Sequence, residues 1–169
     1  AISKNLKLSL KKIINVTNNF KQLDFRQQII YRSEKLIIIN DSKSTSLSST
    51  LPLLESFTNI YWILGGMAKK GDKLKLKKEN FKNIKAFIYG KDKLIFSKIL
   101  SNKIKYKISK NLNHSLSQVF KDLKIKEDQK KILLFSPSAA SFDQFKNFED
   151  RGKYFNKLIK KYFNKFKHV

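Results

Sequence analysis

Residues 36–46, which read LIIINDSKSTS, pass from an uninterrupted apolar run to an uninterrupted polar one. A short apolar run bounded by polar turn residues predicts a buried strand, which we expect over residues 35–39. Leucines then recur at helical spacing over residues 47–54, with Pro52 expected in the first turns of that helix. The stretch therefore predicts a strand, a turn and a helix, the unit from which parallel sheets covered by helices are built.

The same alternation of strand and helix patterns continues along the chain. We expect residues 26–33 and 35–39 to form a hairpin, and further strands at residues 60–64, 85–89, 104–108 and 131–135. Helical spacing of apolar residues predicts amphipathic helices around residues 3–15, 96–100, 116–123 and 155–166. The lysine-rich residues 71–80 are expected to form a solvated loop. The pattern predicts an α/β fold with a mostly parallel sheet and helices on both faces.

Length and composition restrict the kind of protein. A chain of 169 residues suits one main domain. It has no cysteine, and its two histidines, His114 and His168, are far apart in sequence, so we expect no metal held by protein ligands alone. No apolar run approaches the roughly 18 residues that span a bilayer. The basic N-terminal segment lacks the features of a signal peptide. We therefore expect a cytoplasmic protein without membrane insertion.

The formal net charge of +24 suggests an affinity for nucleic acid, because cationic side chains displace the counterions of phosphates. The positive residues are almost all lysine, however, and they are dispersed along the chain. Arginine, which favours base readout and bidentate phosphate contacts, occurs only at Arg26, Arg32 and Arg151. We attribute the charge to solubility and expect no nucleic-acid partner. A lysine-rich nucleic-acid-binding module is the alternative.

Ligands of parallel α/β sheets bind beyond the carboxyl ends of the strands. Four segments follow predicted strands in this chain: residues 40–46, 65–70, 90–92 and 136–148. The first combines a carboxylate, an ammonium group and hydroxyls at a turn whose backbone N–H groups favour anions. Helix capping by Ser44, Thr45 or Ser46 explains those hydroxyls equally well. The chain has no phosphate-binding G-x-x-x-x-G-K-[ST] loop and no nucleophile paired with a base, so it indicates a small anionic ligand without a self-contained catalyst.

Three motifs in these segments, taken in order, resemble the Mur ligases. They are NDSKST at residues 40–45, LGG with Lys69 at residues 64–69, and SPSAASFDQFKNFEDRG at residues 136–152. The third motif favours the branch of the family that adds D-glutamate. The resemblance implies that residues 25–169 form a Rossmann-like, amino-acid-binding C-terminal domain. It also implies that residues 1–24 are the last helix and linker of an otherwise missing central ATPase domain.

The resemblance implies an activity for the full-length ligase. ATP would phosphorylate the carboxylate of UDP-N-acetylmuramoyl-L-alanine, and the amine of D-glutamate would attack the acyl phosphate. ATP and Mg²⁺ would be held mainly by the missing central domain, so we expect this chain alone to be inactive and assign it no catalytic residue. The full-length enzyme is expected to be a monomer. A Mur ligase that adds a different amino acid and a folded but inactive remnant are the alternatives.

Matching the motifs residue by residue gives two sets of site residues. The D-glutamate set is Thr45, Lys69, Ser141, Phe142 and Phe148, and the nucleotide set is Arg26, Asp41 and Lys43. Two departures from the family pattern stand beside these sets. Phe25 occupies a position where the family usually has histidine, and Met67-Ala68 replaces a usual Asp-Gly. The first departure removes any polar contact of that histidine, and the second alters the turn that carries Lys69.

Overall fold

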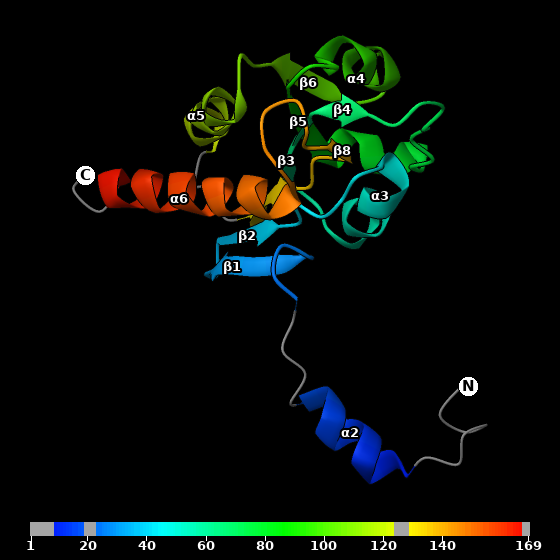
Figure 1. Ribbon diagram of the computed structural model, residues 1–169, viewed down its shortest axis with the longest axis vertical. Helices are drawn as coiled ribbons and strands as arrows, with labels where there is room; N and C mark the ends of the chain where they lie inside the picture. Colours follow the sequence, from blue (N-terminus) through cyan, green and yellow to red (C-terminus); the bar gives the residue numbers. More distant parts are fainter. Residues whose placement is uncertain (1–8, 19–22, 124–128, 167–169) are drawn as a thin grey trace.

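The computed structural model describes residues 9–18, 23–123 and 129–166 (Figure 1). Its helices are α2 (Leu10–Asn18), α3 (Leu47–Ser56), α4 (Lys93–Leu100), α5 (Leu112–Asp122), α6 (Phe148–Phe166) and the 3-10 helix η1 (Lys78–Asn83). Its strands are β1 (Gln28–Arg32), β2 (Leu36–Asn40), β3 (Ile60–Gly65), β4 (Met67–Ala68), β5 (Ile84–Tyr89), β6 (Lys105–Ile108), β7 (Lys131–Phe135) and β8 (Ala139–Ala140). Every strand predicted from the sequence is present.

The main sheet has six strands in the order β1-β2-β7-β3-β5-β6. The edge strand β1 pairs antiparallel with β2, as the predicted hairpin requires, and all other neighbours are parallel. Parallel strands need crossover connections, and helices supply them here. The predicted α/β class with a mostly parallel sheet is confirmed.

Two helices cover each face of the sheet. Side chains of α3 and α4 pack on one face with Ile37 and Ile39, and side chains of α5 and α6 pack on the other with Leu36 and Ile38 (Figure 1). Successive strand residues point to opposite faces, so a strand covered on both sides must be apolar at every position. This explains why the run at residues 36–39 is uninterrupted.

Helix α3 begins at a capped turn. Ser46 is its N-cap and forms a capping box with Ser49, in which each side chain bonds to the other residue's backbone N–H. The helix-capping interpretation is thus confirmed for Ser46. Pro52 lies in the second turn of the helix. The Oδ2 atom of Asp72 accepts a further hydrogen bond from the backbone N–H of Leu47, the first residue of α3.

The prediction of a solvated loop at residues 71–80 is wrong in part, and residues 78–80 belong to η1. Leu76 is buried on the face covered by α3 and α4, and Leu74 packs against the same cluster. The lysines between and beside them, Lys73, Lys75 and Lys77, are exposed. This extended segment alternates apolar and charged residues with period two, so it buries one side and solvates the other.

The N-terminal helix prediction can be compared with the structure only in part. Helix α2 covers residues 10–18, whereas residues 3–8 of the predicted helix lie outside the described residues. Leu10, Ile14 and Val16 of α2 are exposed. None of the helices within residues 9–18, 23–123 and 129–166 combines the length and apolar character needed to cross a membrane.

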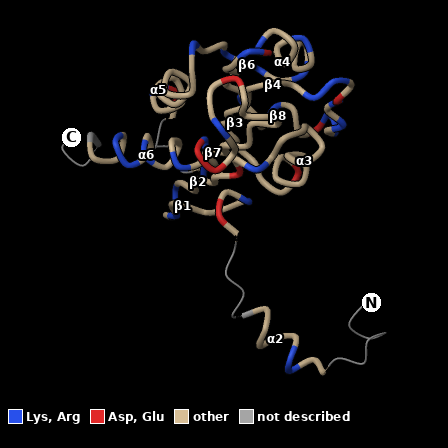
Figure 2. Tube along the Cα trace, in the orientation of Figure 1, with Lys and Arg blue, Asp and Glu red and all other residues tan. Residues whose placement is uncertain are grey.

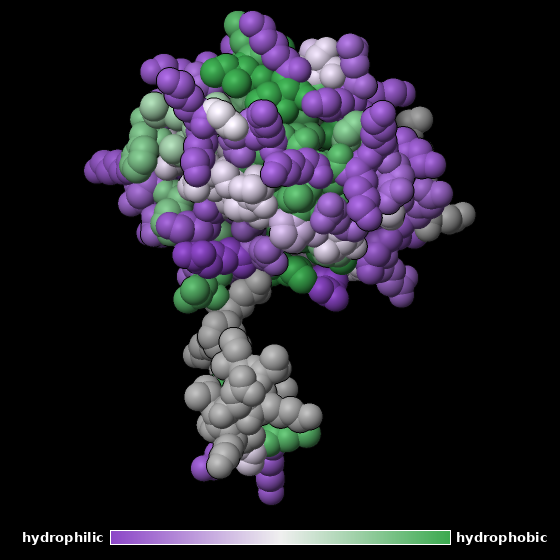
Figure 3. All heavy atoms as spheres, turned by 90° about the vertical axis from the view of Figure 1, so that its right-hand side faces the viewer, coloured by the Kyte–Doolittle hydropathy of each residue, from purple (hydrophilic) through white to green (hydrophobic). Residues whose placement is uncertain are grey.

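The lysines are spread over the outer surface of the fold. Figure 2 shows Lys and Arg on α2, α4, α6 and the connecting loops, and acidic residues interspersed among them. In Figure 3, hydrophilic residues cover most of the visible face and leave smaller hydrophobic areas between them. The distribution along the trace agrees with the dispersed lysines of the sequence.

Candidate functional site

The turn after β2 is fixed at the carboxyl edge of the sheet by its own polar side chains. The Asn40 Nδ2 atom donates to the Gly152 carbonyl at 3.0 Å and to Asn156 Oδ1 at 2.8 Å, which ties the turn to α6. The Asn40 Oδ1 atom accepts from the backbone N–H of Ser42 at 3.1 Å. These bonds satisfy polar groups that leave the sheet at the strand end. The turn therefore has a defined position relative to α6.

Asp41 is buried within this turn. One carboxylate oxygen accepts from the backbone N–H of Gln27 at 3.0 Å, and the other accepts from Ser136 Oγ at 2.8 Å. Burial raises the pKa of Asp41, although the hydrogen bonds from Ser136 and Gln27 and the charge of Arg26 act in the opposite direction. Each carboxylate oxygen of Asp41 therefore accepts one hydrogen bond from the protein and retains a further lone pair.

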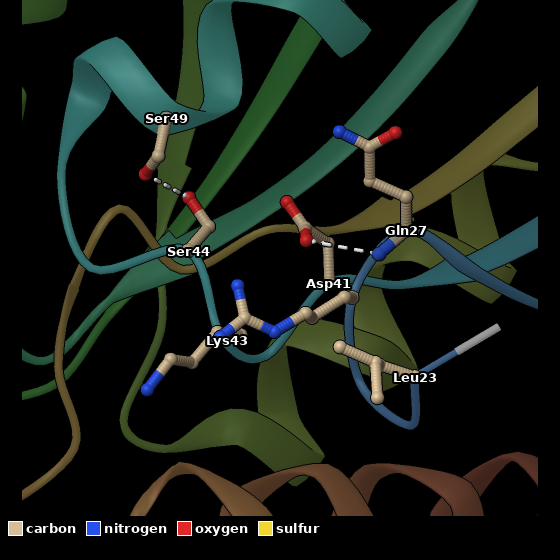
Figure 4. Close-up of a pocket in the computed structure, with 7 residues that line it drawn as sticks. Leu23, Gln27, Asp41, Lys43, Ser44 and Ser49 are labelled. Carbon is tan, nitrogen blue, oxygen red and sulfur yellow. Dashed lines mark hydrogen bonds between the residues drawn. The ribbon is translucent and has the colours of Figure 1, made fainter. Parts of the chain in front are cut away.

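A hollow of about 420 Å³ lies beside Asp41 (Figure 4). All three residues predicted to bind the nucleotide, Arg26, Asp41 and Lys43, line it. The other lining residues are Leu23, Gln27, Ser44 and Ser49. Two cations and hydroxyl groups around a hollow suit an anionic, phosphate-bearing ligand. The structure thus brings the nucleotide set together, while the roles of its members stay predictions.

Phe148 connects the two predicted sets of site residues. The Nζ atom of Lys43 lies 3.9 Å from the centroid of the Phe148 ring, within range of a cation–π interaction. The Phe148 carbonyl accepts from Ser42 Oγ at 2.8 Å. The first residue of α6 is therefore held against the turn that carries the nucleotide set, although the motifs place Phe148 in the D-glutamate set.

The short strands β4 and β8, which sequence reasoning did not predict, bring two strand-end loops side by side. They pair antiparallel, with Met67 opposite Ala140 and Ala68 opposite Ala139. Gly66 precedes this pair at φ +134°, and a Cβ on it would lie 2.4 Å from the Ala140 carbonyl oxygen, so only glycine fits. The loop that carries Lys69 is thereby placed next to the loop that carries Ser141.

The departure at Met67-Ala68 lies in this ribbon. The Ala68 backbone N–H donates to Asp92 Oδ2 at 2.8 Å. The bonds that hold the segment come from its backbone, which any non-proline residue supplies. Phe25, the other departure, is buried with its ring against Gly152, and its carbonyl accepts from the Lys43 backbone N–H at 3.0 Å.

The five residues of the predicted D-glutamate set are spread along the carboxyl edge. Thr45 and Lys69 are exposed, Ser141 is buried, and Phe142 is 71% exposed. Phe142 lines a second hollow, of about 670 Å³, with Met67, Gly90, Lys91, Asp143 and Gln144. No hydrogen bond or ring contact joins any two of the five within the part of the chain that the structure describes. Their roles stay predictions.

Arg151 lies in the third motif, and the sequence indicated no role for it. Its side chain is 1% exposed and donates three hydrogen bonds. Nε reaches Ser42 Oγ at 3.1 Å, Nη2 reaches the Ser42 carbonyl at 2.7 Å, and Nη1 reaches the Ala139 carbonyl at 3.0 Å. The sequence feature that could have drawn attention to Arg151 is its residue type, because it is one of only three arginines among the 37 Lys and Arg residues.

A buried hydroxyl network was also missed. Thr50 Oγ1 lies 2.6 Å from Ser44 Oγ, 2.8 Å from Ser136 Oγ and 2.6 Å from Ser138 Oγ. Ser136 Oγ in turn donates a hydrogen bond to Asp41 Oδ2, so the network extends to Asp41. Ser44 thus serves the interior and is not the N-cap of α3. The members of the hydroxyl network come from two distant segments of the chain and follow no period, so the sequence pattern did not predict the network.

These features define the class of protein. The chain is an α/β domain whose strand-end loops place cationic and hydroxyl side chains around a hollow at the carboxyl edge of the sheet. No family model matches the chain. Curated proteins named UDP-N-acetylmuramoylalanine–D-glutamate ligase do match it.

Three of these relatives show the extent of the similarity. The protein of Rickettsia prowazekii is 36% identical over 162 residues, which are 96% of this chain and 36% of that protein. The protein of the Wolbachia endosymbiont of Brugia malayi is 35% identical over 95% of this chain and 32% of its own length. That of Hydrogenobaculum is 37% identical over 93% of this chain and 38% of its own length. The chain therefore belongs to the Mur ligase family, and it spans about a third of the length of the curated relatives it matches.

Proposed function

We propose that this chain is the amino-acid-binding part of an ATP-dependent ligase that adds D-glutamate to UDP-N-acetylmuramoyl-L-alanine in peptidoglycan precursor synthesis. The observation that carries the proposal is the similarity over 93–96% of the chain to relatives named for that reaction. The convergence of the three motifs at one edge of the sheet supports it. The comparisons give no support to a nucleic-acid-binding module.

The reaction makes an amide from a carboxylate, which is a poor acceptor because it would have to expel oxide. In the proposed sequence, a carboxylate oxygen of UDP-N-acetylmuramoyl-L-alanine attacks the γ-phosphorus of ATP, which releases ADP and gives an acyl phosphate. The amine of D-glutamate then attacks the acyl carbon, the nitrogen loses a proton to solvent, and inorganic phosphate leaves with the C–O bond electrons. A bound magnesium ion would offset the charge on the transferring phosphoryl group.

The site residues divide between the two substrates that meet at this edge. Lys69 would pair with a carboxylate of D-glutamate, and Ser141 and Thr45 would donate hydrogen bonds to it. Phe142 and Phe148 would border its carbon chain. On the nucleotide side, Arg26 and Lys43 would contact phosphate oxygens, and Asp41 would accept from the ribose hydroxyls. The cation–π contact of Lys43 with Phe148 supports adjacent positions for the two ligands.

The proposed ligase holds ATP and magnesium mainly outside this chain. Among the described residues, no group of three or more His, Cys, Asp and Glu side chains is placed to hold a metal ion. We assign residues 1–24 to the ATPase domain and residues 25–169 to the amino-acid-binding domain. The chain by itself would not turn over substrate, and the complete enzyme would act as a cytoplasmic monomer.

The proposal is tested in a ligase in which this chain is joined to the remaining segments that its relatives carry. D-glutamate-dependent phosphate release is measured for the unchanged protein and for Lys69→Ala, with the exposed neighbour Lys70→Ala as the matched control. Loss of a charged hydrogen bond weakens binding by about 1.5–3 kcal/mol, or roughly 10- to 150-fold in the KM for D-glutamate. Lys70→Ala should leave that KM unchanged. Undiminished activity of Lys69→Ala would refute the assigned role, and phosphate release only with another amino acid would reassign the substrate.

A further inference from the structure

We propose that Arg151 is a positioning residue that sets the separation between the nucleotide side and the amino-acid side of the site. This inference rests on the proposed function for its kinetic readout. Its structural basis does not depend on the proposed function. One guanidinium bonds to two segments that follow different strands. Ser42 belongs to the turn after β2, and Ala139 belongs to β8, after β7.

The contacts of the guanidinium extend to two further strand ends. Through the β4–β8 pairing, Ala139 is joined to Ala68, the residue before Lys69. A Cβ on Gly66, after β3, would lie 3.3 Å from Arg151 Nη1, so the backbone there passes close to the guanidinium. The buried Tyr89, at the end of β5, lies beside it as well. The guanidinium of Arg151 therefore lies close to the residues at or after the ends of β2, β7, β3 and β5.

Helix stability does not explain an arginine at this position. Arg151 is the fourth residue of α6, where a positive charge opposes the helix dipole. Burial of a cation is costly unless hydrogen bonds replace its hydration. Within the described residues no carboxylate lies within ion-pair distance of Arg151, although the charge of Asp143 and the Tyr89 side chain favour its charged form. Its three hydrogen bonds go to the carbonyls of Ser42 and Ala139 and to the hydroxyl of Ser42.

The planar fork of arginine is what this geometry requires. Nε and Nη2 point to Ser42, while Nη1 points to Ala139, so the two loops are held at a separation set by one rigid group. The turn that includes Ser42 also carries Asp41 and Lys43, and the segment after Ala139 carries Ser141. A change at Arg151 should therefore affect both ligands, although the side chain is buried and lies outside the set that touches them.

The kinetic test compares Arg151→Met and Arg151→Lys with Lys153→Met, an exposed lysine of the same helix, in the complete ligase. We expect Arg151→Met to raise the KM values for ATP and for D-glutamate by about tenfold or more each, because both loops lose their common donor. Arg151→Lys keeps the charge without the fork and should raise both values to a smaller extent. Lys153→Met should leave both within about twofold. If both values stay unchanged in Arg151→Met, or only one rises, the proposal is refuted.

A second variant covers the case in which Arg151→Met does not fold. Ser42→Ala removes the Oγ acceptor of Nε and leaves the Ser42 carbonyl in place. It should raise both KM values a few-fold, as Arg151→Lys does. Wild-type values in both Ser42→Ala and Arg151→Lys would overturn the positioning role.

A structural readout separates this proposal from the proposed function. In the chain itself, backbone amide chemical shifts of Ser42, Ala139 and Met67 are compared between the wild type, Arg151→Lys and Lys153→Met. We expect shifts at all three amides in Arg151→Lys and none in Lys153→Met. Unshifted amides in Arg151→Lys refute the positioning role whether or not the ligase is active. Absence of D-glutamate-dependent phosphate release from the wild-type ligase refutes the proposed function alone.

Discussion

Replacement of Gly152 by alanine tests how tightly Phe25 is packed against α6. A Cβ on Gly152 would lie 2.3 Å from Cδ1 and 2.6 Å from Cγ of Phe25, which is closer than real Cβ atoms approach other heavy atoms. The Phe25 ring is buried, and its backbone has φ +60°, so it has little freedom to move away. The same region holds the site, because Phe25 bonds to Lys43 and Gly152 bonds to Asn40.

Two opposed terms set the magnitude. Alanine is about 1 kcal/mol more favourable than glycine inside a helix, whereas insertion of a methyl group into a packed contact costs about 1–3 kcal/mol. Gly152→Ala should therefore lower the free energy of unfolding by about 0–2 kcal/mol. When Phe25→Ala removes the ring, only the helix term remains, and the same substitution should raise the free energy of unfolding by about 1 kcal/mol. The predicted coupling between the two positions is about 1–3 kcal/mol.

The measurement is urea denaturation of the wild type, the two single variants and the double variant. Fluorescence of Trp62, the one tryptophan of the chain and fully buried, reports unfolding. Lys153→Ala, at an exposed position of the same helix, gives the baseline for a helix substitution without a packing conflict. If Gly152→Ala changes the free energy of unfolding equally in both backgrounds, to within about 0.3 kcal/mol, the proposed contact does not limit packing.

Two further predictions concern the capped helix and an ion-pair cluster. Ser46→Ala should lower the free energy of unfolding by about 0.5–2 kcal/mol, because the N-cap of α3 is lost. The control Ser48→Ala, at an exposed neighbouring position, should change the free energy of unfolding by less than about 0.5 kcal/mol. Equal effects of the two substitutions in urea denaturation would contradict the capping role. Burial acts to raise the pKa of Asp122, but hydrogen bonds and charges from Lys85 and Lys107 outweigh it and hold the pKa below its usual value. The ionised carboxylate thus stabilises the fold above pH 3.8, and this stability is lost as the pH falls through the lower folded value. Asp122→Asn should cost about 1 kcal/mol at pH 7 and progressively less below pH 3.8, and a loss independent of pH would refute the ionic origin.

Sequence patterns determined the fold class and the edge of the sheet that carries the candidate site. The apolar run at residues 36–39 can be satisfied only by burial on both faces, and the amphipathic helices supply the cover. The carboxyl ends of parallel strands share one edge, so the strand pattern alone predicts that residues 40–46 and 136–148 lie there. The cap at Ser46 was one of three candidates, because local hydrogen bonds are encoded locally.

Only the tertiary structure decided which side chains are buried around those segments and which partners their polar groups have. Leu76 was expected to be solvated because its neighbours are lysines, yet it packs in the cluster that α3 and α4 cover. The period-two alternation of its segment indicates one buried side but not which elements cover that side. Ser44 looked like a cap and instead joins a network with Thr50 and residues more than 80 positions away. Arg151 bonds to Ser42 across 109 positions. Periodicity reports which side of an element is buried, whereas the partner of a buried polar group depends on how distant elements meet in space. The sequence therefore determined which edge of the sheet carries the candidate site, and the packing of α6 against the strand ends decided how the side chains of that edge are held.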